Sequence, residues 1–426
     1  MMTMQTVVLT AVTAVPLLGA SLHTPAAPAG LEPKKTYAVI VGMLGTASAP
    51  DWDKENRKDQ ELFDTLARKG VPTNNMAIIL DEQATPEGAR TALSNVLQQT
   101  TPDSTFIFYF TGHGGPGVCF TYREGFNVSE ITVAVKKLFK GRNILLMADC
   151  CHSGGLGVVA NDLAAAGFRA ASLTSADVTV ISIGDWTFSQ TLLAALNGDV
   201  VFDEDHDGFV TLGEAAAEVA LAMEYRAHQL YGFTLAGLPE SWHLAATNGA
   251  PVPRGRAPGS FRLKQYVNAP CDNEKQVGRI VGWDQGKYRV EFLRYSDKTW
   301  ATCTPDQLDA ISFKRFATGT TVAVSHHRET LPATVVKVQN DFHLVRYVGW
   351  PGNHEEWVLS NRILGDAADH PPQKDLVFVE WHGTWWLAKI KKTDARDKRY
   401  FIHYVGDSDN WDEWVTDARM KRAGDH

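Results

Sequence analysis

The stretch NILLMADCCHSGG, residues 143–155, joins an apolar run to a turn of polar and sulfur-bearing side chains. Residues 144–148 have the length and composition of a buried strand. The turn carries one aspartate, two adjacent cysteines and one histidine, and two glycines then let the backbone leave it in conformations that other residues avoid. The sequence therefore predicts a buried strand that presents a thiol at its carboxyl end.

A second stretch has the same construction. TFIFYFTGHGG, residues 105–115, is an apolar run that ends at His113 between glycines. In open sheets of parallel strands, functional sites form at the carboxyl ends of the strands. The two stretches therefore predict a cysteine and a histidine at the same edge of one sheet.

Strands and helices alternate around these two stretches. Further strands are expected at 36–42, 76–80, 170–173 and 178–183, and helices at 55–69, 86–98, 129–139 and 188–196. Such alternation predicts the α/β class, with a mainly parallel sheet flanked by helices.

The two stretches resemble the caspase-like clan of cysteine peptidases, and most closely the metacaspases and their bacterial relatives. The resemblance rests on His-Gly-Gly at 113–115 and Asp-Cys-Cys-His-Ser-Gly at 149–154, and it covers roughly residues 35–248. It implies a caspase-like peptidase domain over residues 35–249. The Gln-Ala-Cys-x-Gly signature of animal caspases is absent from the sequence, so the specificity of caspases is not carried over.

The resemblance also implies the catalytic groups. A cysteine is a good nucleophile only as the thiolate, and a nearby histidine takes and returns the proton. The family position immediately before His-Ser-Gly implies that Cys151, rather than Cys150, is the nucleophile, and that His113 is the general base and then the general acid. The N–H groups of Gly114 and Cys151 would bind the oxyanion. The alternative is a pair of core thiols with a structural histidine.

Two carboxylates are candidates for the substrate pocket. Asp149 takes the position of the acid that lines the pocket for the residue before the cut in metacaspase-like enzymes, and Asp59 falls where the family has Asn-Asp at the start of the first helix. Two such carboxylates would pair well with Arg or Lys and poorly with Asp. The alternatives are a turn-capping role for Asp149 and a solvated helix-surface charge for Asp59.

Residues 203–214, DEDHDGFVTLGE, match the calcium-loop template at each specified position. The expected Ca²⁺ ligands are Asp203, Asp205, Asp207, Phe209 through its carbonyl, Thr211 and Glu214. A single loop indicates a structural or activating calcium rather than a sensor. The alternative is an acidic turn that caps the helix expected at 212–229 without metal.

Residues 250–260, APVPRGRAPGS, form a linker without periodicity. Beyond it, tryptophans recur at intervals of 57 residues, at Trp300, Trp357 and Trp414, each behind a strand of alternating residues. The repeats predict three small all-β barrels, at 261–313, 314–366 and 371–422. The last two are similar to Tudor-knot, chromo-like or agenet modules, and the first is a looser match.

The last two repeats are rich in aromatic side chains. Tyr347, Trp350 and Trp357, and likewise Tyr404, Trp411 and Trp414, are candidates for aromatic cages that bind methylated lysine by cation–π contact. The alternative is that most of these side chains form the cores of tiny barrels.

Charge and hydropathy limit the kinds of molecule that the protein is expected to bind. Residues 31–250 carry a formal net charge of −11 and residues 251–426 one of +3. The acidic half favours basic substrates, and the second half is too nearly neutral to argue for nucleic acid. An apolar run at 5–22, with Ala27-Pro28-Ala29 behind it, is either a signal peptide or a disordered extension. It is too short, and interrupted by Pro16, for a good membrane span.

The sequence thus predicts a cysteine endopeptidase that cleaves a protein or peptide after Arg or Lys through a thioester acyl-enzyme. Its C-terminal modules would recruit the substrate or a protein partner. The alternative is an inactive caspase fold that serves as a scaffold or binding protein through its Tudor-like modules.

Overall fold

The computed structural model describes residues 30–422 apart from short internal segments. The segments left out are 46–51, 53, 183–185, 226, 228, 249–256, 272–273, 293–298, 312–313, 327–328, 340–341, 352–353, 372, 382–383 and 406–408. The N-terminal apolar run, and with it the choice between a signal peptide and an extension, lies outside the described residues. So does most of the linker at 250–260.

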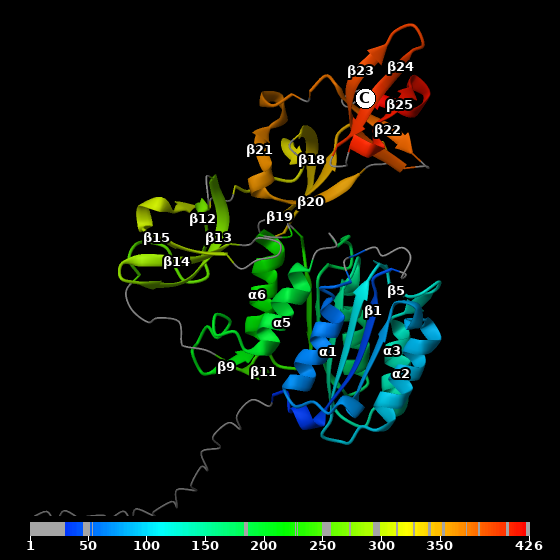
Figure 1. Cartoon of the computed structure of the whole chain (residues 1–426), viewed down its shortest axis with the longest axis vertical. Coiled ribbons are helices and arrows are strands. Elements are labelled where there is room, and N and C mark those ends of the chain that lie inside the picture. The colour runs from blue at the N-terminus through cyan, green and yellow to red at the C-terminus, as the bar shows by residue number, and fades with distance from the viewer. Residues whose placement is uncertain are drawn as a thin grey trace, which may run out of the picture.

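A six-stranded sheet in the order β10-β8-β7-β3-β1-β2 forms the centre of the first domain (Figure 1). Its strands are β1 (Thr36–Met43), β2 (Met76–Leu80), β3 (Thr105–Gly112), β7 (Asn143–Asp149), β8 (Arg169–Thr174) and β10 (Gly232–Ala236). All neighbours run parallel except β10, which pairs antiparallel with β8. The parallel register of β3 and β7 brings Thr111 opposite Asp149, so the two strands end side by side.

Helices cover both faces of this sheet, because alternate strand residues point to opposite sides. Val39 and Val41 of β1 pack in one core, while Ala38 and Ile40 pack in the other. The first core is closed by α2 (Pro86–Gln98), α3 (Ser129–Leu138) and α4 (Leu156–Ala165). The second is closed by α1 (Lys58–Arg68), α5 (Thr187–Asn197) and α6 (Leu212–Tyr225). The predicted α/β class, a mainly parallel sheet flanked by helices, is confirmed.

Two parts of this domain differ from the expectation. Residues 178–183 were expected to form a strand, and the described part of this segment is a loop without strand pairing. The physical reason is that β10 already occupies the free edge of β8. A small sheet of β4 (Gly114–Gly115), β5 (Val118–Phe120) and β6 (Gly125–Asn127) also follows β3.

Three five-stranded antiparallel sheets follow the first domain, and we call them modules 1, 2 and 3. Module 1 contains β12 (Tyr266–Cys271), β13 (Glu274–Asp284), β14 (Lys287–Phe292), β15 (Thr299–Cys303) and β16 (Asp309–Ala310). Module 2 contains β17 (Thr321–His326), β18 (Glu329–Gln339), β19 (Phe342–Tyr347), β20 (Glu355–Leu359) and β21 (Ile363–Asp366). Module 3 contains β22 (Leu376–Trp381), β23 (Thr384–Asp394), β24 (Arg399–Tyr404), β25 (Glu413–Thr416) and β26 (Met420–Arg422).

The three modules share one strand order, in which the fifth strand returns to the first. The small all-β units are confirmed, but within the described strands the two edges of each sheet do not pair with each other, so each is an open, curved sheet rather than a closed barrel. Modules 2 and 3 also share one hydrophobic cluster, in which Val345 and Tyr347 of module 2 and Phe378 of module 3 are members. The hydrophobic core therefore continues from one of these modules to the other.

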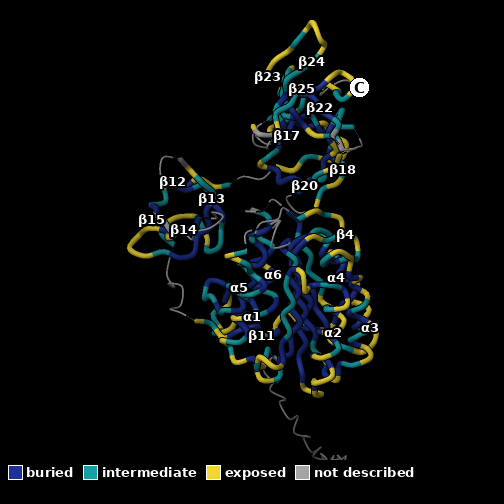
Figure 2. The backbone as a smooth tube through the Cα atoms, turned by 45° about the vertical axis from the view of Figure 1, so that its right-hand side comes forward, coloured by how far each residue is buried: buried dark blue, intermediate teal, exposed yellow. Residues whose placement is uncertain are grey.

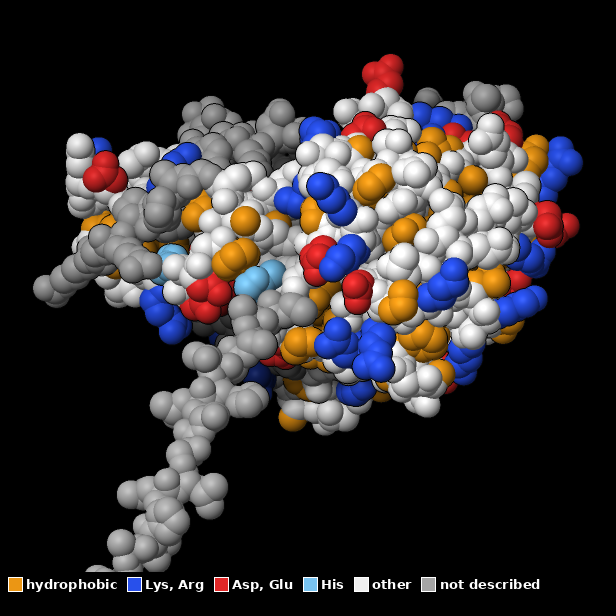
Figure 3. All heavy atoms as spheres, turned by 90° about the horizontal axis from the view of Figure 1, so that it is seen from below, with side chains coloured by type: hydrophobic (Ala, Val, Ile, Leu, Met, Phe, Trp, Pro, Cys, Tyr) orange, Lys and Arg blue, Asp and Glu red, His pale blue; other side chains and the backbone are white. Residues whose placement is uncertain are grey.

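Module 2 lies over the end of the first domain, with β19 and β20 nearest to it (Figures 1 and 2). On the face that is seen from below in Figure 3, hydrophobic side chains are scattered among charged ones. No helix within the described residues is long and apolar enough to cross a membrane.

Candidate active site

The two adjacent cysteines after β7 lie in different surroundings. Cys150 is 5% exposed and packs in the sheet core beside Cys119. A hydrogen bond with the Cys119 thiol, together with burial, raises the pKa of the Cys150 thiol well above its ordinary value. Cys151 is only partly buried and lines an open cavity. Of the two thiols, Cys151 is therefore the one that a substrate can reach.

His113 follows β3 and lies on the same cavity as Cys151. The chain around it depends on glycine at two positions. Gly112 has a φ of +142°, which other residues rarely adopt. A Cβ on Gly114 would come within 2.5 Å of the Cys151 carbonyl oxygen and 2.7 Å of the Cys150 sulfur. The backbone of Gly114 thus packs against the cysteine turn, so the structure brings together the residues expected to form the dyad and the oxyanion site.

The cavity at this edge of the sheet has a volume of about 400 Å³. It is lined by Trp52, Thr111, Gly112, His113, Asp149, Cys150, Cys151, Ile181, Ser182 and Trp186. A thiol, an imidazole and a carboxylate therefore border one space large enough for a long side chain.

Trp52 is a member of this site that sequence reasoning missed. Its ring centroid lies 4.6 Å from that of His113, with the two planes tilted by 46°. A neighbouring ring of this size restricts the rotation of the imidazole and forms one wall of the cavity. Trp52 stands in a segment between β1 and α1 that has no periodic pattern, so nothing in the sequence distinguished it from a loop residue.

Asp149 lies where the pocket acid was expected. Its carboxylate lines the cavity, is 7% exposed, and accepts a 2.5 Å hydrogen bond from the Ser189 hydroxyl. That hydroxyl is also 2.6 Å from the phenol oxygen of Tyr109. Burial, and then the charge of Asp149, raises the pKa of Tyr109 well above its ordinary value. Tyr109 therefore stays neutral and the negative charge of this wall belongs to Asp149.

Asp59 does not form a second acidic wall of this cavity. It is fully buried at the start of α1, and its two oxygens accept hydrogen bonds of 2.7 and 2.8 Å from the Arg57 guanidinium. Arg57 also bonds Asp81, which Lys54 approaches to 3.1 Å. The prediction for Asp59 was wrong because Arg57, two residues earlier in the chain, neutralises its carboxylate. The sequence does not show in which direction the Arg57 side chain points.

A loop at 177–182 closes one side of the cavity and is bonded to the cysteine turn. The N–H of His152 donates to the carbonyl of Val180 at 2.9 Å, and the Cys151 thiol donates to the carbonyl of Ser182 at 3.8 Å. His152 itself has a left-handed backbone, with φ of +55°, and its Nδ1 lies 3.0 Å from the Val178 carbonyl. The cysteine turn and the loop therefore stabilise each other, and both the backbone and the imidazole of His152 bond to carbonyl groups of the loop.

The loop at 203–214 brings three of its expected ligands together. Carboxylate oxygens of Asp203, Asp205 and Glu214 all lie within 4.8 Å of one another. Asp207 is outside this group, and its carboxylate accepts the N–H of Phe209 at 2.8 Å. The donor set is all oxygen and suits Ca²⁺.

The same loop also begins α6. Glu214 accepts hydrogen bonds from the N–H and the hydroxyl of Thr211, at 2.9 and 2.8 Å, and Thr211 accepts from the N–H of Glu214. The helix-capping alternative is therefore realised in the fold, and it does not exclude a cation between the carboxylates.

Tyr347 and Tyr404, the tyrosines of the two expected aromatic cages, are core residues. Each makes a hydrogen bond that was not predicted from the sequence. The Tyr347 hydroxyl donates to Glu356 in module 2, and the Tyr404 hydroxyl donates to Glu413 at 2.8 Å in module 3. Each glutamate is in turn held by an arginine, Arg362 in module 2 and Arg419 in module 3. The pattern Tyr-x8-Glu-x5-Arg repeats after 57 residues, and this repeat is the sequence signal that would have found the interaction.

This cluster also perturbs the ionisation of its members. Burial alone would raise the pKa of Glu356, but hydrogen bonds from His326 and Arg362 hold it well below its ordinary value. Burial raises the pKa of Tyr347 and of Tyr404, and the neighbouring glutamate adds to the effect. The tyrosines are therefore neutral donors to ionised glutamates in the interior of each module.

In module 2 the two tryptophans of the expected cage are separated. Trp350 stacks on His354 at 4.4 Å and packs on Phe378 of module 3 at 4.7 Å, so it fills the junction of two modules. Trp357 belongs to a different cluster from Tyr347, on the opposite face of the sheet. In module 3, Trp411 and Trp414 are exposed by 58% and 43%. In module 2, Tyr347 and Trp350 therefore meet, with ring centroids 5.5 Å apart, but Trp357 lies apart from them, and in module 3 Tyr404 is buried in the core.

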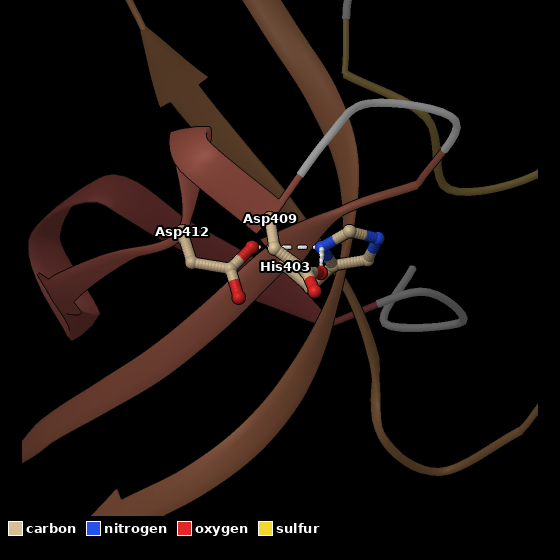
Figure 4. A group of neighbouring side chains, drawn as sticks. All are labelled: His403, Asp409 and Asp412. Atoms are coloured by element: carbon tan, nitrogen blue, oxygen red, sulfur yellow. Dashed lines mark hydrogen bonds and ion pairs between the residues drawn. The ribbon is translucent and has the colours of Figure 1, made fainter.

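A second group of potential metal ligands lies in module 3. His403 Nδ1 is 2.7 Å from Asp412 and 3.3 Å from Asp409 (Figure 4). The Lys391 ammonium lies 3.0 Å from Asp409 and 2.8 Å from Asp412. Because this cation already bridges the two carboxylates, the group is accounted for as an ion-pair network.

Comparison with known proteins adds a family for module 3 and likenesses for the first domain. A family model described as "Tudor-knot: RNA binding activity-knot of a chromodomain" matches residues 373–422. Among solved structures, caspase-1 from Spodoptera frugiperda matches 56% of this chain and all of its own, at 11% identity and a TM-score of 0.39. Protein GSU0716 from Geobacter sulfurreducens matches 50% of this chain and all of its own, at 12% identity and a TM-score of 0.38. No curated protein matches the sequence.

The family match confirms a Tudor-knot module at the C-terminal end of the chain. The closer assignment of the first domain to the metacaspases stays a prediction.

Proposed function

We propose that this chain is a cysteine endopeptidase that cleaves after Arg or Lys. The observation that carries the proposal is the single cavity bordered by Cys151, His113 and Asp149. The Cys151 thiolate would attack the scissile carbonyl, and the oxyanion would be stabilised by the N–H groups of Gly114 and Cys151. The C–N bond would then break as His113 returns the proton to the leaving amine. Water would hydrolyse the thioester and restore the thiol.

The proposed preference for a basic residue rests on the charge of the cavity walls. Asp149 contributes a carboxylate, and Trp52 and Trp186 contribute aromatic walls to the same space. A carboxylate with aromatic neighbours suits a guanidinium or ammonium group, which gains a charge-assisted hydrogen bond and cation–π contact. Because Asp59 is paired with Arg57, the proposed preference for Arg or Lys depends on the carboxylate of Asp149 alone.

The test is turnover of an Arg-ended fluorogenic peptide by the full chain and its variants. We expect Cys151→Ala and His113→Ala to reduce cleavage to background, and Cys150→Ala, the matched control in the adjacent position, to retain most of it. Full activity in Cys151→Ala would reject the nucleophile, and an inactive wild-type chain would favour the alternative of a scaffold with a caspase-like fold.

We also propose that Ca²⁺ binds the 203–214 loop and supports the peptidase domain. The convergence of Asp203, Asp205 and Glu214 supports this. The remaining expected ligands, the Phe209 carbonyl, Thr211 and Asp207, would complete the shell only with local rearrangement, because Asp207 and Thr211 are bonded within the loop.

A binding function is proposed for module 3, with a protein as its partner. Trp414 and Trp411 are exposed, and the Arg399 guanidinium that lies 5.4 Å from the Trp414 ring is paired with Asp394 and Asp397. Paired cations do not form the unbalanced basic surface that single-stranded nucleic acid requires. The family description includes RNA binding, so a salt-titrated binding assay with single-stranded RNA is the direct check. Tight, salt-dependent binding would overturn the protein partner.

A further inference from the structure

Module 2 contacts the first domain through one face of its sheet. We call this the outer face, and it carries Phe342, Leu344, Trp357 and Leu359. Register pairs Phe342 with Leu359 and Leu344 with Trp357. The alternate residues of the same strands, Val345 and Val358, point into the core of the module. The outer face is therefore not needed to close the module's own core.

The outer face is covered by two residues of the first domain. Leu230, which follows α6, and Val180, in the loop at 177–182, form one cluster with the four outer-face residues. Trp357 is 9% exposed in this contact, whereas Trp414, on the corresponding strand of module 3, is 43% exposed. The tryptophan at this position is thus buried in module 2, which contacts the first domain, and exposed in module 3.

Both of these first-domain residues, Leu230 and Val180, lie beside the cavity rather than in its lining. The carbonyl of Val180 accepts the N–H of His152, immediately after Cys151, and the N–H of Asp177 donates to the carbonyl of Leu230 at 3.0 Å. The next residues of the loop, Ile181 and Ser182, line the cavity itself. Module 2 therefore packs against a loop that is hydrogen-bonded to the cysteine turn.

The loop has little other apolar support. Val178 and Ile181 are exposed by 45% and 68%, so Val180 is the apolar residue of the loop that module 2 helps to cover. A loop with few buried contacts and exposed backbone opens at low free-energy cost. Removing the outer face would therefore release the wall of the cavity while leaving the sheet and the cysteine turn in place.

We propose that module 2 is a built-in clamp whose outer face holds the loop at 177–182 in the form that binds substrate. This inference rests on the proposed peptidase function for its effect on cleavage. The contact itself does not, because it is a property of the fold.

The test uses the full chain with the contact weakened from either side. Trp357→Ala truncates the outer face, and Leu230→Ala truncates its counterpart in the first domain. Trp386→Ala is the matched control, since Trp386 is an exposed tryptophan in the sheet of module 3, outside this cluster. The first readout is hydrogen exchange of the amides at 177–182, and the second is kcat and KM on an Arg-ended peptide.

We expect both contact variants to speed exchange at 177–182 and to raise KM by roughly tenfold, which corresponds to about 1.4 kcal/mol of lost contact free energy. The value of kcat should change less, because Cys151 and His113 keep their own strands. Trp386→Ala should change neither readout. The double variant should cost less than the sum of the single ones, because both remove the same contact.

The outcomes separate the two proposals. Unchanged exchange and unchanged KM in both folded contact variants would overturn the clamp. An inactive wild-type chain whose loop exchange still rises in both variants would support the clamp and reject the peptidase. If Trp357→Ala unfolds module 2, Leu230→Ala still decides, because it leaves the module's sequence intact.

Discussion

Cys150 and Cys151 show how one position along the chain separates an inert thiol from an accessible one. Strand β7 alternates its side chains, and the first cysteine after it is buried in the core beside Cys119, whereas the second is only partly buried at the cavity. Burial disfavours the thiolate that nucleophilic attack requires. The assignment of Cys151, which the family motif implied, thus has a physical basis in burial.

Asp149 is the residue on which the proposed specificity depends. We expect Asp149→Asn to lower kcat/KM for Arg-ended peptides by more than about a hundredfold, because leaving a buried cation without its partner costs roughly 3–5 kcal/mol. Cleavage of a peptide with a neutral residue of similar length, such as Gln, should fall much less. The measurement is the ratio of kcat/KM for the two peptides.

Asp59→Asn is the matched control for this prediction. Asp59 bonds Arg57 inside the domain rather than lining the cavity. We expect this variant to lower the melting temperature and to keep the preference for Arg. If Asp59→Asn removes the preference while Asp149→Asn retains it, the acid of the pocket has been placed wrongly.

The loop at 177–182 is an element whose structure depends on its neighbours. Its apolar residues were expected to form a strand, but β10 pairs with β8 at the edge that this strand would have needed. The backbone groups of the loop bond the cysteine turn and the chain after α6 instead. A segment that would have extended the sheet thereby becomes a wall of the cavity.

The 203–214 loop and α6 form a second such element. If calcium binds, it binds only where Asp203, Asp205 and Glu214 converge, and this arrangement exists only in the folded chain. We expect millimolar calcium to raise the melting temperature, with a stabilisation of about 2.7 kcal/mol when calcium reaches a hundred times its Kd.

Asp205→Asn should remove most of the calcium-dependent rise and keep the melting temperature without calcium. Asp205 accepts a bond from the N–H of Asp207 that an amide oxygen would also accept, so the turn is preserved. The control is Asp162→Asn, an exposed acid on α4, which should respond to calcium as the wild type does. An equal rise in both variants would mean that calcium acts elsewhere.

Across the whole molecule, module 1 is attached to the first domain by a buried ion cluster. Glu218 on α6 is fully buried and is held by Arg279 and by Lys264, whose ammonium is 3.1 Å away. Arg279 also bonds Glu291 within module 1 at 2.8 Å. Two cations, Arg279 and Lys264, thus balance two carboxylates, Glu218 and Glu291, between α6 and module 1.

Arg279→Met should therefore loosen module 1 from the first domain. It leaves two buried carboxylates against one cation, and breaking a buried pair from one side costs roughly 3–5 kcal/mol. We expect a lower first melting transition and faster hydrogen exchange in α6. Adding Glu218→Gln to Arg279→Met should restore part of the loss, whereas a further loss would show that the cluster does not act as a unit.

Modules 1 and 2 are thus occupied by contacts with the first domain, through Arg279 and through the outer face of module 2. Module 3 contacts module 2 and keeps Trp411 and Trp414 exposed. The three modules share one strand order but differ in their contacts. Module 3 is the one that keeps exposed tryptophans available to a partner.

Much of this molecule could be read from local pattern. Buried strands, amphipathic helices and period-two strands follow from the order of apolar and polar residues, which acts over a few residues. The positions of β1, β2, α2 and the cysteine turn, the three repeats, and the meeting of a cysteine with His113 at one sheet edge were all predicted on that basis, whereas the choice of Cys151 came from the family resemblance. The parallel arrangement of the strands made the last of these a matter of topology rather than of side-chain detail.

Long-range pairing settled the rest, because a side chain's partner is chosen by the fold and not by its neighbours in the chain. Arg57 neutralises Asp59, and the ring of Trp52 packs against His113. Glu356 and Glu413 accept hydrogen bonds from the tyrosines that were expected to face a ligand. Whether the outer face of a module is covered likewise depends on which surface lies opposite. For Trp357 that surface is formed by Leu230 and Val180 of the first domain, and for Trp414 none of the described residues covers it to the same extent.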